Sequence, residues 1–260
     1  MQELDQLTIK NFSEEAKEDL INQEGAAFLL SNWEEVVFIH YEVDPKILQR
    51  EIPFPLDLFE GKAYVSLVAF TIKQLRFKWG GHVSAWVTTP FATHHYFNVR
   101  TYVRHNQSLG IYFMAEWLSK KICVMMGAFM YGLPYRYGYL NYENDYKVGH
   151  VYGKIRPSDL EGSFVYQGNV EPSENFCRFV PGSLGEFLGE RYIAFAGHGL
   201  NLRYFRIWHK PWLQSPFEVK VEHNSLFSKL GPWAENAYYA GAHYSPGVFD
   251  VWIGKPGWLS

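Results

Sequence analysis

Strand-like segments, each dense in aromatic and β-branched residues, follow one another along this chain with few helical stretches between them. The aromatic content is high, with 20 Phe, 18 Tyr and 9 Trp among 260 residues. Aromatic side chains suit the pleated, half-buried surface of a sheet and bury large areas, so this excess favours strands over helices. Because the strands do not alternate regularly with helices, the sequence predicts an α+β fold with a mostly antiparallel sheet that can roll into a barrel.

A hairpin is the clearest single element of the sequence. Its predicted strands are Tyr96–Arg104 and Ile111–Leu118, which are joined by a turn at Asn106-Gln107. If this turn has two residues, His105 pairs with Ser108, and counting outward fixes every other pair in the hairpin.

The register of this hairpin decides where a buried arginine points. In the two-residue register, Arg100 lies opposite Phe113 and shares a face with Ile111, Phe113, Ala115 and Trp117, while Glu116 points the other way. An odd-numbered turn or a bulge would reverse this and make Arg100 and Glu116 an internal ion pair. We predict the two-residue register, which leaves Arg100 available to a ligand.

The remaining pattern predicts one domain behind a short helical extension. No Gly/Ser-rich or Pro-rich linker divides the chain, so we predict an N-terminal helical extension over residues 1–32 and a single domain over 33–260. The predicted elements are a helix at Asn11–Leu30, a strand covered on both faces at Glu34–Val43, a strand at Ala63–Ile72, an irregular loop or lid at Arg76–Thr93, a helix at Ser119–Phe129 and a capping box at Ser183–Glu186 that opens a helix.

Charge, cysteine content and hydropathy exclude several classes of protein. The formal net charge is −3 and no window concentrates Lys and Arg, so a nucleic-acid partner is not expected. Two cysteines, Cys123 and Cys177, are too few for a secreted disulfide scaffold. Met1–Lys10 has no apolar h-region and no run reaches the length of a membrane span, so we expect a cytoplasmic protein without a membrane segment.

The sequence shows no metal-ligand spacing. The ten histidines are scattered, and the neighbours His94 and His95 would point to opposite faces of a strand. The pair Lys120-Lys121 comes closest to a catalytic signal, since a lysine beside a second cation has a lowered pKa, but two such lysines in a first helical turn are commonly just solvated. We therefore expect no metal and no cofactor.

The polar residues of the hairpin are the first candidates for a binding site. Asn98, Arg100 and Tyr102 share one face of an otherwise apolar strand, and Glu116 lies on the partner strand. A buried guanidinium must be paired or must face a cavity, and its donors match a carboxylate bidentately. The alternative is an internal ion pair with Glu116, Glu42 or Asp57.

Several segments resemble the YqjF-like family of uncharacterised proteins, in order from about Trp33 to Lys255. They are Trp33, Phe38–Pro45, Gly61–Phe70, Asn98–Val103, Gly110–Phe113, Leu133–Tyr135, Phe187–Tyr192 and His209–Trp212. That family is similar in fold to acetoacetate decarboxylase. The resemblance implies a cone-like, mostly antiparallel barrel with a central cavity and flanking helices.

The resemblance does not extend to the decarboxylase reaction. The decarboxylase family has a Gly-x-Pro-Lys-Lys stretch, and the similar stretch here is Gly132-Leu133-Pro134-Tyr135-Arg136. Tyr135 stands at the position of the Schiff-base lysine and Arg136 at that of its cationic neighbour. A phenol cannot form an imine, so the resemblance leaves Tyr135 and Arg136 as candidate acid and oxyanion donors.

We therefore expect a cavity that binds a small organic acid or carbonyl compound, lined by Arg100, Tyr135 and Arg136 and without a Schiff-base lysine. One alternative is a lyase- or hydrolase-type enzyme that uses Tyr135 and Arg136. Another is a structural or regulatory protein with a filled barrel. The sequence leaves the ligand and the oligomeric state open, a homo-oligomer included.

Overall fold

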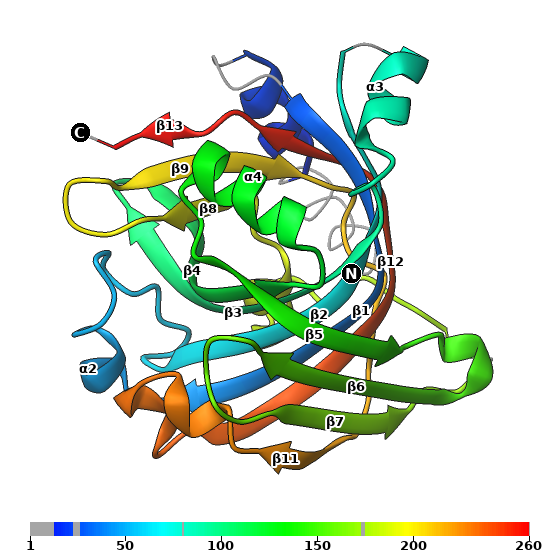
Figure 1. The fold of residues 1–260 in the computed structure, drawn as a ribbon. Coiled ribbons are helices and arrows are strands. Elements are labelled where there is room, and N and C mark those ends of the chain that lie inside the picture. The colour runs from blue at the N-terminus through cyan, green and yellow to red at the C-terminus, as the bar shows by residue number, and fades with distance from the viewer. Residues whose placement is uncertain (1–12, 23–26, 80, 173–174, 260) are drawn as a thin grey trace.

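The computed structural model describes residues 13–22, 27–79, 81–172 and 175–259 (Figure 1). Its strands are β1 Ala27–Val43, β2 Ala63–Phe77, β3 His94–His105, β4 Ser108–Leu118, β5 Tyr135–Glu143, β6 His150–Pro157, β7 Phe164–Asn169, β8 Ile193–Ala196, β9 Arg203–Trp208, β10 Ser215–Pro216, β11 Val219–Asn224, β12 Tyr238–Gly254 and β13 Gly257–Trp258. Its helical segments are residues 13–22, α2 Pro45–Leu48, α3 Gly81–Thr88, α4 Lys121–Tyr131, α5 Leu184–Gly189 and the 3-10 turns η1 Tyr146–Val148, η2 Phe227–Lys229 and η3 Pro232–Ala234. The predicted α+β class with mostly antiparallel strands is confirmed.

Seven strands close into a ring in the order β1, β2, β3, β4, β8, β9, β12. All contacts between these neighbours are antiparallel except the one that closes the ring, where β8 runs parallel to β4. This seam is short, with Ile111 opposite Ala194 and Tyr112 opposite Phe195. The ring agrees with the cone-like arrangement that the resemblance implied, and α4 lies across its opening (Figure 1).

A second sheet of β5, β6, β7 and β11 continues from β4 and packs on the outside of the ring (Figure 1). The ring strand β1 shows the result, with buried side chains on both of its faces. In β1, Val37 and Ile39 join the core between the two sheets, while Val36 and Phe38 join the core inside the ring. Alternate side chains of a strand point to opposite faces, which explains why odd-numbered and even-numbered positions of this segment are both apolar. The prediction of a strand at Glu34–Val43 covered on both faces is confirmed.

The N-terminal helix is shorter than the Asn11–Leu30 helix expected from the sequence. Residues 13–22 are helical, but β1 has already begun at Ala27; residues 11, 12 and 23–26 lie outside the described part. Leu29 and Leu30 pair with Ile253 and Trp252 of β12, so pairing in the sheet overrides the helical pattern of this apolar run. β1 passes without a break through residues 32 and 33, where the sequence suggested a boundary.

The segment Arg76–Thr93, expected to be an irregular loop or lid, contains the end of β2 and the helix α3. The hydroxyl of Ser84 accepts a hydrogen bond from the Phe77 backbone at 3.0 Å, which ties α3 to the end of β2. Val83 and Trp86 of α3 are exposed, so the helix has no apolar stripe facing the core that the sequence could have revealed. By contrast, the capping box is confirmed, since the Ser183 hydroxyl caps α5.

Candidate functional site

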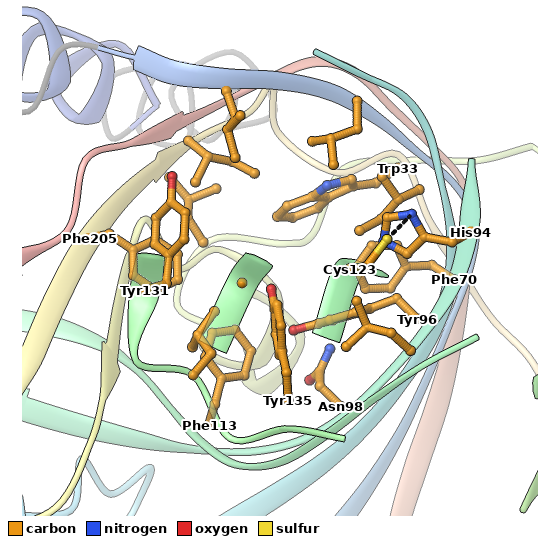
Figure 2. Close-up of a pocket in the computed structure, with 18 of the residues that line it drawn as sticks. Trp33, Phe70, His94, Tyr96, Asn98, Phe113, Cys123, Tyr131, Tyr135 and Phe205 are labelled. Atoms are coloured by element: carbon orange, nitrogen blue, oxygen red, sulfur yellow. Dashed lines mark hydrogen bonds between the residues drawn. The ribbon is translucent and has the colours of Figure 1, made fainter. Parts of the chain in front are cut away.

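A cavity of about 130 Å³ lies inside the ring, with α4 forming part of its wall (Figure 2). Most of its lining is aliphatic or aromatic, with a few polar groups, which is the usual composition of a small-molecule site. The lining residues are Leu29, Trp33, Phe70, Ile72, Leu75, Phe77, Phe91, His94, Tyr96, Asn98, Arg100, Ile111, Phe113, Leu118, Cys123, Met126, Gly127, Met130, Tyr131, Leu133, Tyr135, Gly189, Arg191, Phe205, Ile207, His209, Trp212 and Ile253.

Three hydroxyl-bearing groups form a chain at one side of the cavity. Tyr135 of β5 and Tyr96 of β3 point their hydroxyl groups toward each other (Figure 2). A hydrogen bond between these two hydroxyls contributes to the pKa shift of each. Tyr96 in turn donates to Oε1 of Glu116. The sheet register produces this arrangement, because Glu116 of β4 lies directly opposite Tyr135 on one side and opposite Asn98 on the other.

Burial keeps this chain of groups protonated. Glu116 is fully buried, and the loss of solvation raises the pKa of its carboxyl well above the usual range. Burial likewise raises the pKa values of Tyr96 and Tyr135 well above that of a free phenol, with Glu116 as a further cause. A carboxyl that is held neutral can donate a hydrogen bond or a proton, and Tyr96 and Tyr135 stand between Glu116 and the cavity.

Several buried polar atoms in or behind the cavity lining have no hydrogen-bond partner among the described residues. They are the Nε of Arg100, the Oδ1 of Asn98, the Oε2 of Glu116 and the Nε1 of Trp33. Buried polar groups are nearly always hydrogen-bonded, and leaving one unpaired costs about 1–3 kcal/mol. Arg100, Asn98 and Trp33 line the cavity and offer such groups to a polar ligand, whereas Glu116, a predicted ligand-binding residue, lies behind the lining.

Arg100 is buried at the cavity wall without a carboxylate from the described chain within 4.0 Å. Its Nη2 donates to the backbone oxygen of Leu188 at 3.1 Å, and its guanidinium lies 5.6 Å from the centre of the Phe38 ring. Arg191 also lines the cavity, but it is neutralised by Asp57 at 2.8 Å. Arg100 is thus the lining arginine whose charge the described protein leaves uncompensated.

The predicted hairpin register is confirmed at its turn and corrected at its far end. His105 pairs with Ser108 and Arg100 lies opposite Phe113, as the two-residue turn requires. A bulge follows, because Met114 has no partner while Val99 pairs with Ala115. The extra residue reverses the alternation beyond it.

This bulge corrects the expectation that Glu116 points away from the Arg100 face. Glu116 lies on the cavity side of β4, opposite Asn98, whereas Ala115 and Trp117 join the core between the sheets. No ion pair between Arg100 and Glu116 forms within 4.0 Å in the described chain, since Glu116 instead accepts from Tyr96.

Two other candidates lie away from the cavity. Arg136 follows Tyr135 in β5 and therefore faces the opposite side, where it pairs with Asp159 at 3.1 Å and is partly exposed. The expectation that it lines the cavity is wrong. Tyr102 is fully buried on the Arg100 face, but its hydroxyl donates to Leu188 O at 2.9 Å and contacts Ser66 Oγ at 2.5 Å, so it supports the wall without lining it.

Sequence reasoning missed two neutral histidines in the lining. The Nδ1 atoms of His94 and His209 donate to the backbone oxygens of Phe91 and Lys210 at 2.9 and 2.8 Å, which leaves each Nε2 as an acceptor. Burial lowers the pKa of both side chains to about 4. His94 stands beside His95 in a strand, and nothing in the sequence tells which of the two faces inward.

The neighbouring thiol of Cys123 is not activated. Its Sγ lies 3.6 Å from Nδ1 of His94, but burial raises the pKa of the thiol to about 11. A nucleophilic cysteine needs a lowered pKa, so this residue acts as a buried apolar group.

The lysine pair also lies outside the cavity. Lys120 donates to Pro90 O at 2.8 Å, and the Lys121 ammonium lies 5.2 Å from the centre of the Tyr137 ring. Among the residues described, the cavity lining contains no lysine. The described chain also has no group of three His, Cys, Asp or Glu side chains able to hold a metal ion, and within it no helix combines the length and apolarity needed to cross a membrane.

Comparison with known proteins shows what this chain resembles. The profile of a family described as "Uncharacterized conserved protein" (DUF2071) matches residues 31–249. The chain is 27% identical over 210 residues to the uncharacterized protein YqjF of Bacillus subtilis (strain 168), covering 80% of this chain and 84% of that one.

The structural neighbours share the fold at low sequence identity. An acetoacetate decarboxylase-like enzyme from Sphingomonas wittichii RW1 aligns with a TM-score of 0.61 and 14% identity, over 90% of this chain and 94% of that one. Acetoacetate decarboxylase from Legionella pneumophila gives a TM-score of 0.59 and 13% identity, over 90% and 88%. The enduracididine biosynthesis enzyme MppR complexed with pyruvate gives 0.60 and 12%, over 91% of each chain.

Proposed function

The chain belongs to the DUF2071 family of uncharacterized conserved proteins, and we propose that its interior cavity binds a small organic acid or carbonyl compound. The observation that carries this proposal is Arg100, a buried guanidinium at the cavity wall with an unpartnered Nε and no carboxylate of the described chain within salt-bridge distance. Burying an uncompensated charge is costly, and a carboxylate ligand would remove that cost.

The groups beside Arg100 suit the same ligand. Asn98 adds an amide, and Tyr135 adds a hydroxyl across the cavity from the aromatic wall formed by Tyr131 and Phe205 (Figure 2). Charge-assisted hydrogen bonds of this kind contribute about 1.5–3 kcal/mol each. MppR, which has a similar fold, is a protein found with pyruvate, a carboxylate of the proposed class.

Calorimetric titration with acetate, pyruvate and acetoacetate tests the proposal. The wild-type protein should bind at least one of these anions, and Arg100→Gln should weaken that binding by about 10-fold or more. Arg100→Lys, which keeps the charge but loses the fork of donors, should lie between the two. Failure of all three anions to bind would overturn the proposal, as would unchanged binding by a folded Arg100→Gln protein.

Arg136→Gln is the matched control for this experiment. It removes the same side chain from a position on the opposite side of β5, where Arg136 contacts Asp159 instead of the cavity. It should leave anion binding unchanged. A loss of affinity in this variant equal to that of Arg100→Gln would mean that net charge, and not the cavity, attracts the anion.

A catalytic role is the second candidate function, and the hydrogen-bonded chain of Tyr135, Tyr96 and Glu116 favours it. Because burial keeps these groups protonated, Tyr135 would act as an acid or hydrogen-bond donor toward a carbonyl oxygen once its hydroxyl turns from Tyr96 to the ligand. Arg136 cannot serve as the oxyanion donor from its position beside Asp159, so Arg100 or Asn98 would take that role. Turnover of a keto acid that disappears in Tyr135→Phe would distinguish catalysis from binding alone.

A further inference from the structure

The cavity has a polar side and an apolar side. Asn98 and Arg100 are buried in the middle of β3, with Tyr96 and Tyr135 beside Asn98 (Figure 2). Away from this polar group, the partly exposed lining side chains other than Trp33 are apolar: Leu29, Leu75, Phe77, Met126, Met130 and Ile253.

The apolar side lies at one end of the ring strands. Leu29 at the start of β1 pairs with Ile253 near the end of β12 and with Phe77 at the end of β2. Along β2, the lining runs from Phe70 through Ile72 and Leu75 to Phe77. The strand positions facing Asn98 and Arg100 are Val68 and Ser66, before this stretch begins. The lining therefore extends along the strand direction, from the polar group past Trp33 and His94 toward an apolar end.

Acetate would leave this apolar end empty, and pyruvate would place its polar carbonyl there. An unfilled apolar space loses the contacts that a ligand could make, and each methylene moved from water into it contributes about 0.8 kcal/mol. An engineered apolar cavity of about 150 Å³ accommodates benzene, so a cavity of about 130 Å³ holds about six non-hydrogen atoms, and a carboxylate takes three of them.

From this geometry we propose that the ligand is an amphipathic monocarboxylate whose apolar group has about three carbons. This inference rests on the proposed function, because Arg100 holds the carboxylate in both. The apolar group extends along β2 toward Leu75 and under Met126 and Met130 of α4.

A series of straight-chain carboxylates from acetate to decanoate, measured by calorimetry, tests the assignment. Affinity should rise about fourfold for each added methylene and reach a plateau at about three carbons beyond the carboxylate, where the cavity is full. Benzoate and phenylacetate, whose rings exceed this space, should bind more weakly than butyrate. Arg100→Gln should lower the affinity for every carboxylate of the series by the same factor, without changing how steeply affinity rises with chain length.

Two variants of α4 locate the apolar end. Met126 lines the cavity, while its neighbour Met125 is 74% exposed. Met126→Trp should bring the plateau to a shorter chain and leave acetate binding unchanged. Met125→Trp, the same change on the outer surface of the helix, should leave the whole series unchanged.

The outcomes separate the two proposals. If carboxylates bind with no dependence on chain length, the amphipathic ligand is ruled out while the binding of small acids stands. If chain length matters but Met126→Trp and Met125→Trp act alike, the apolar group binds elsewhere and the inference is wrong. If no carboxylate binds at all, the proposed function fails and this inference fails with it.

Discussion

Glu116 is a carboxyl group that the fold buries completely beside a tyrosine. Tyr96 is its hydrogen-bond donor, and no cation of the described chain lies within 4.0 Å of it. An isolated buried carboxylate is very costly, so such a group is held in its neutral form and its pKa rises. Glu116 therefore makes the stability of the protein depend on pH in a direction that can be stated in advance.

The folded protein holds the proton of Glu116 more tightly than the unfolded chain, so its contribution is present at low pH and is lost as pH rises above about 4.5. Glu116→Gln removes this dependence while keeping the shape of the side chain. The variant should therefore gain stability relative to wild type between about pH 5 and pH 8, by on the order of 1–3 kcal/mol. Urea unfolding at a series of pH values measures the difference. The exposed Glu143, changed to Gln, is the control that should follow wild type throughout.

Tyr135 occupies the position where the resembling decarboxylases carry their imine-forming lysine. Because a phenol cannot form an imine and the described lining contains no lysine, borohydride with acetoacetate or pyruvate should leave the protein mass unchanged. Intact-protein mass spectrometry measures this directly. An adduct on Lys121, the first residue of α4, or on Lys120 before it would show that the chain has another imine-forming lysine. The proposal of binding without a Schiff base would then be wrong.

At the scale of elements, α4 is held against the ring by direct contact between a glycine and an aromatic ring. A Cβ atom added at Gly127 would lie 2.0 Å from the Cε2 of Tyr135, far inside contact distance. Gly127 thus allows the helix to lie on the face of Tyr135 and fixes the position of that ring in the cavity.

Gly127→Ala should therefore destabilise the protein by about 1–3 kcal/mol, even though alanine is the better helix former by about 1 kcal/mol. It should also weaken anion binding, because Tyr135 or α4 must move. Thermal unfolding and calorimetry test both effects. Met125→Ala, a change to the same residue on the exposed side of α4, supplies the comparison and should alter neither property by a similar amount.

The hairpin β3–β4 illustrates how far sequence reasoning reached. The turn at Asn106 and Gln107 follows from local residue preferences, so the register up to Arg100 and Phe113 could be predicted. The bulge at Met114 could not, since nothing in the local residues distinguishes it from continuous alternation. The inward position of Glu116, and with it the chain to Tyr135, depends on that bulge.

The closure of the ring was equally hidden from the sequence. β8 and β4 are more than 80 residues apart and meet over two residue pairs, with Gly110 so close to Ile193 that an added Cβ would lie 2.5 Å from its backbone oxygen. Pairings between distant segments leave no periodic signal in either one. The resemblance to a known family, and not the residue pattern, predicted the cone-like shape and the position of Tyr135 at the cavity.

For the whole molecule, buried histidines predict sensitivity to acid. Burial lowers the pKa values of His94, His209 and His243 to about 4, whereas the same groups in the unfolded chain titrate near 6.5. The unfolded chain therefore takes up protons first, and stability is lost as pH falls through this window. Glu190, whose pKa burial raises to about 7, opposes the effect by one proton.

The net loss should be on the order of 2–3 kcal/mol per pH unit near pH 5. Urea unfolding at several pH values between about 7 and 4 measures this slope. His209→Gln, which removes one fully buried imidazole, should reduce the slope, while the same change at the exposed His150 should not. A wild-type protein whose stability is constant across this range would contradict the assignment of these histidines as neutral.

The unpaired Met114 has a consequence for how related chains diverge. Deleting a single residue there would restore strict alternation, turning Glu116 outward and bringing Trp117 into the cavity in its place. Such an event changes no side chain, yet it exchanges a protonated acid for an indole in the interior. The number of residues between the turn and Glu116 is therefore as consequential as their identity, and a related chain that lacks one residue here should carry a different group in its interior.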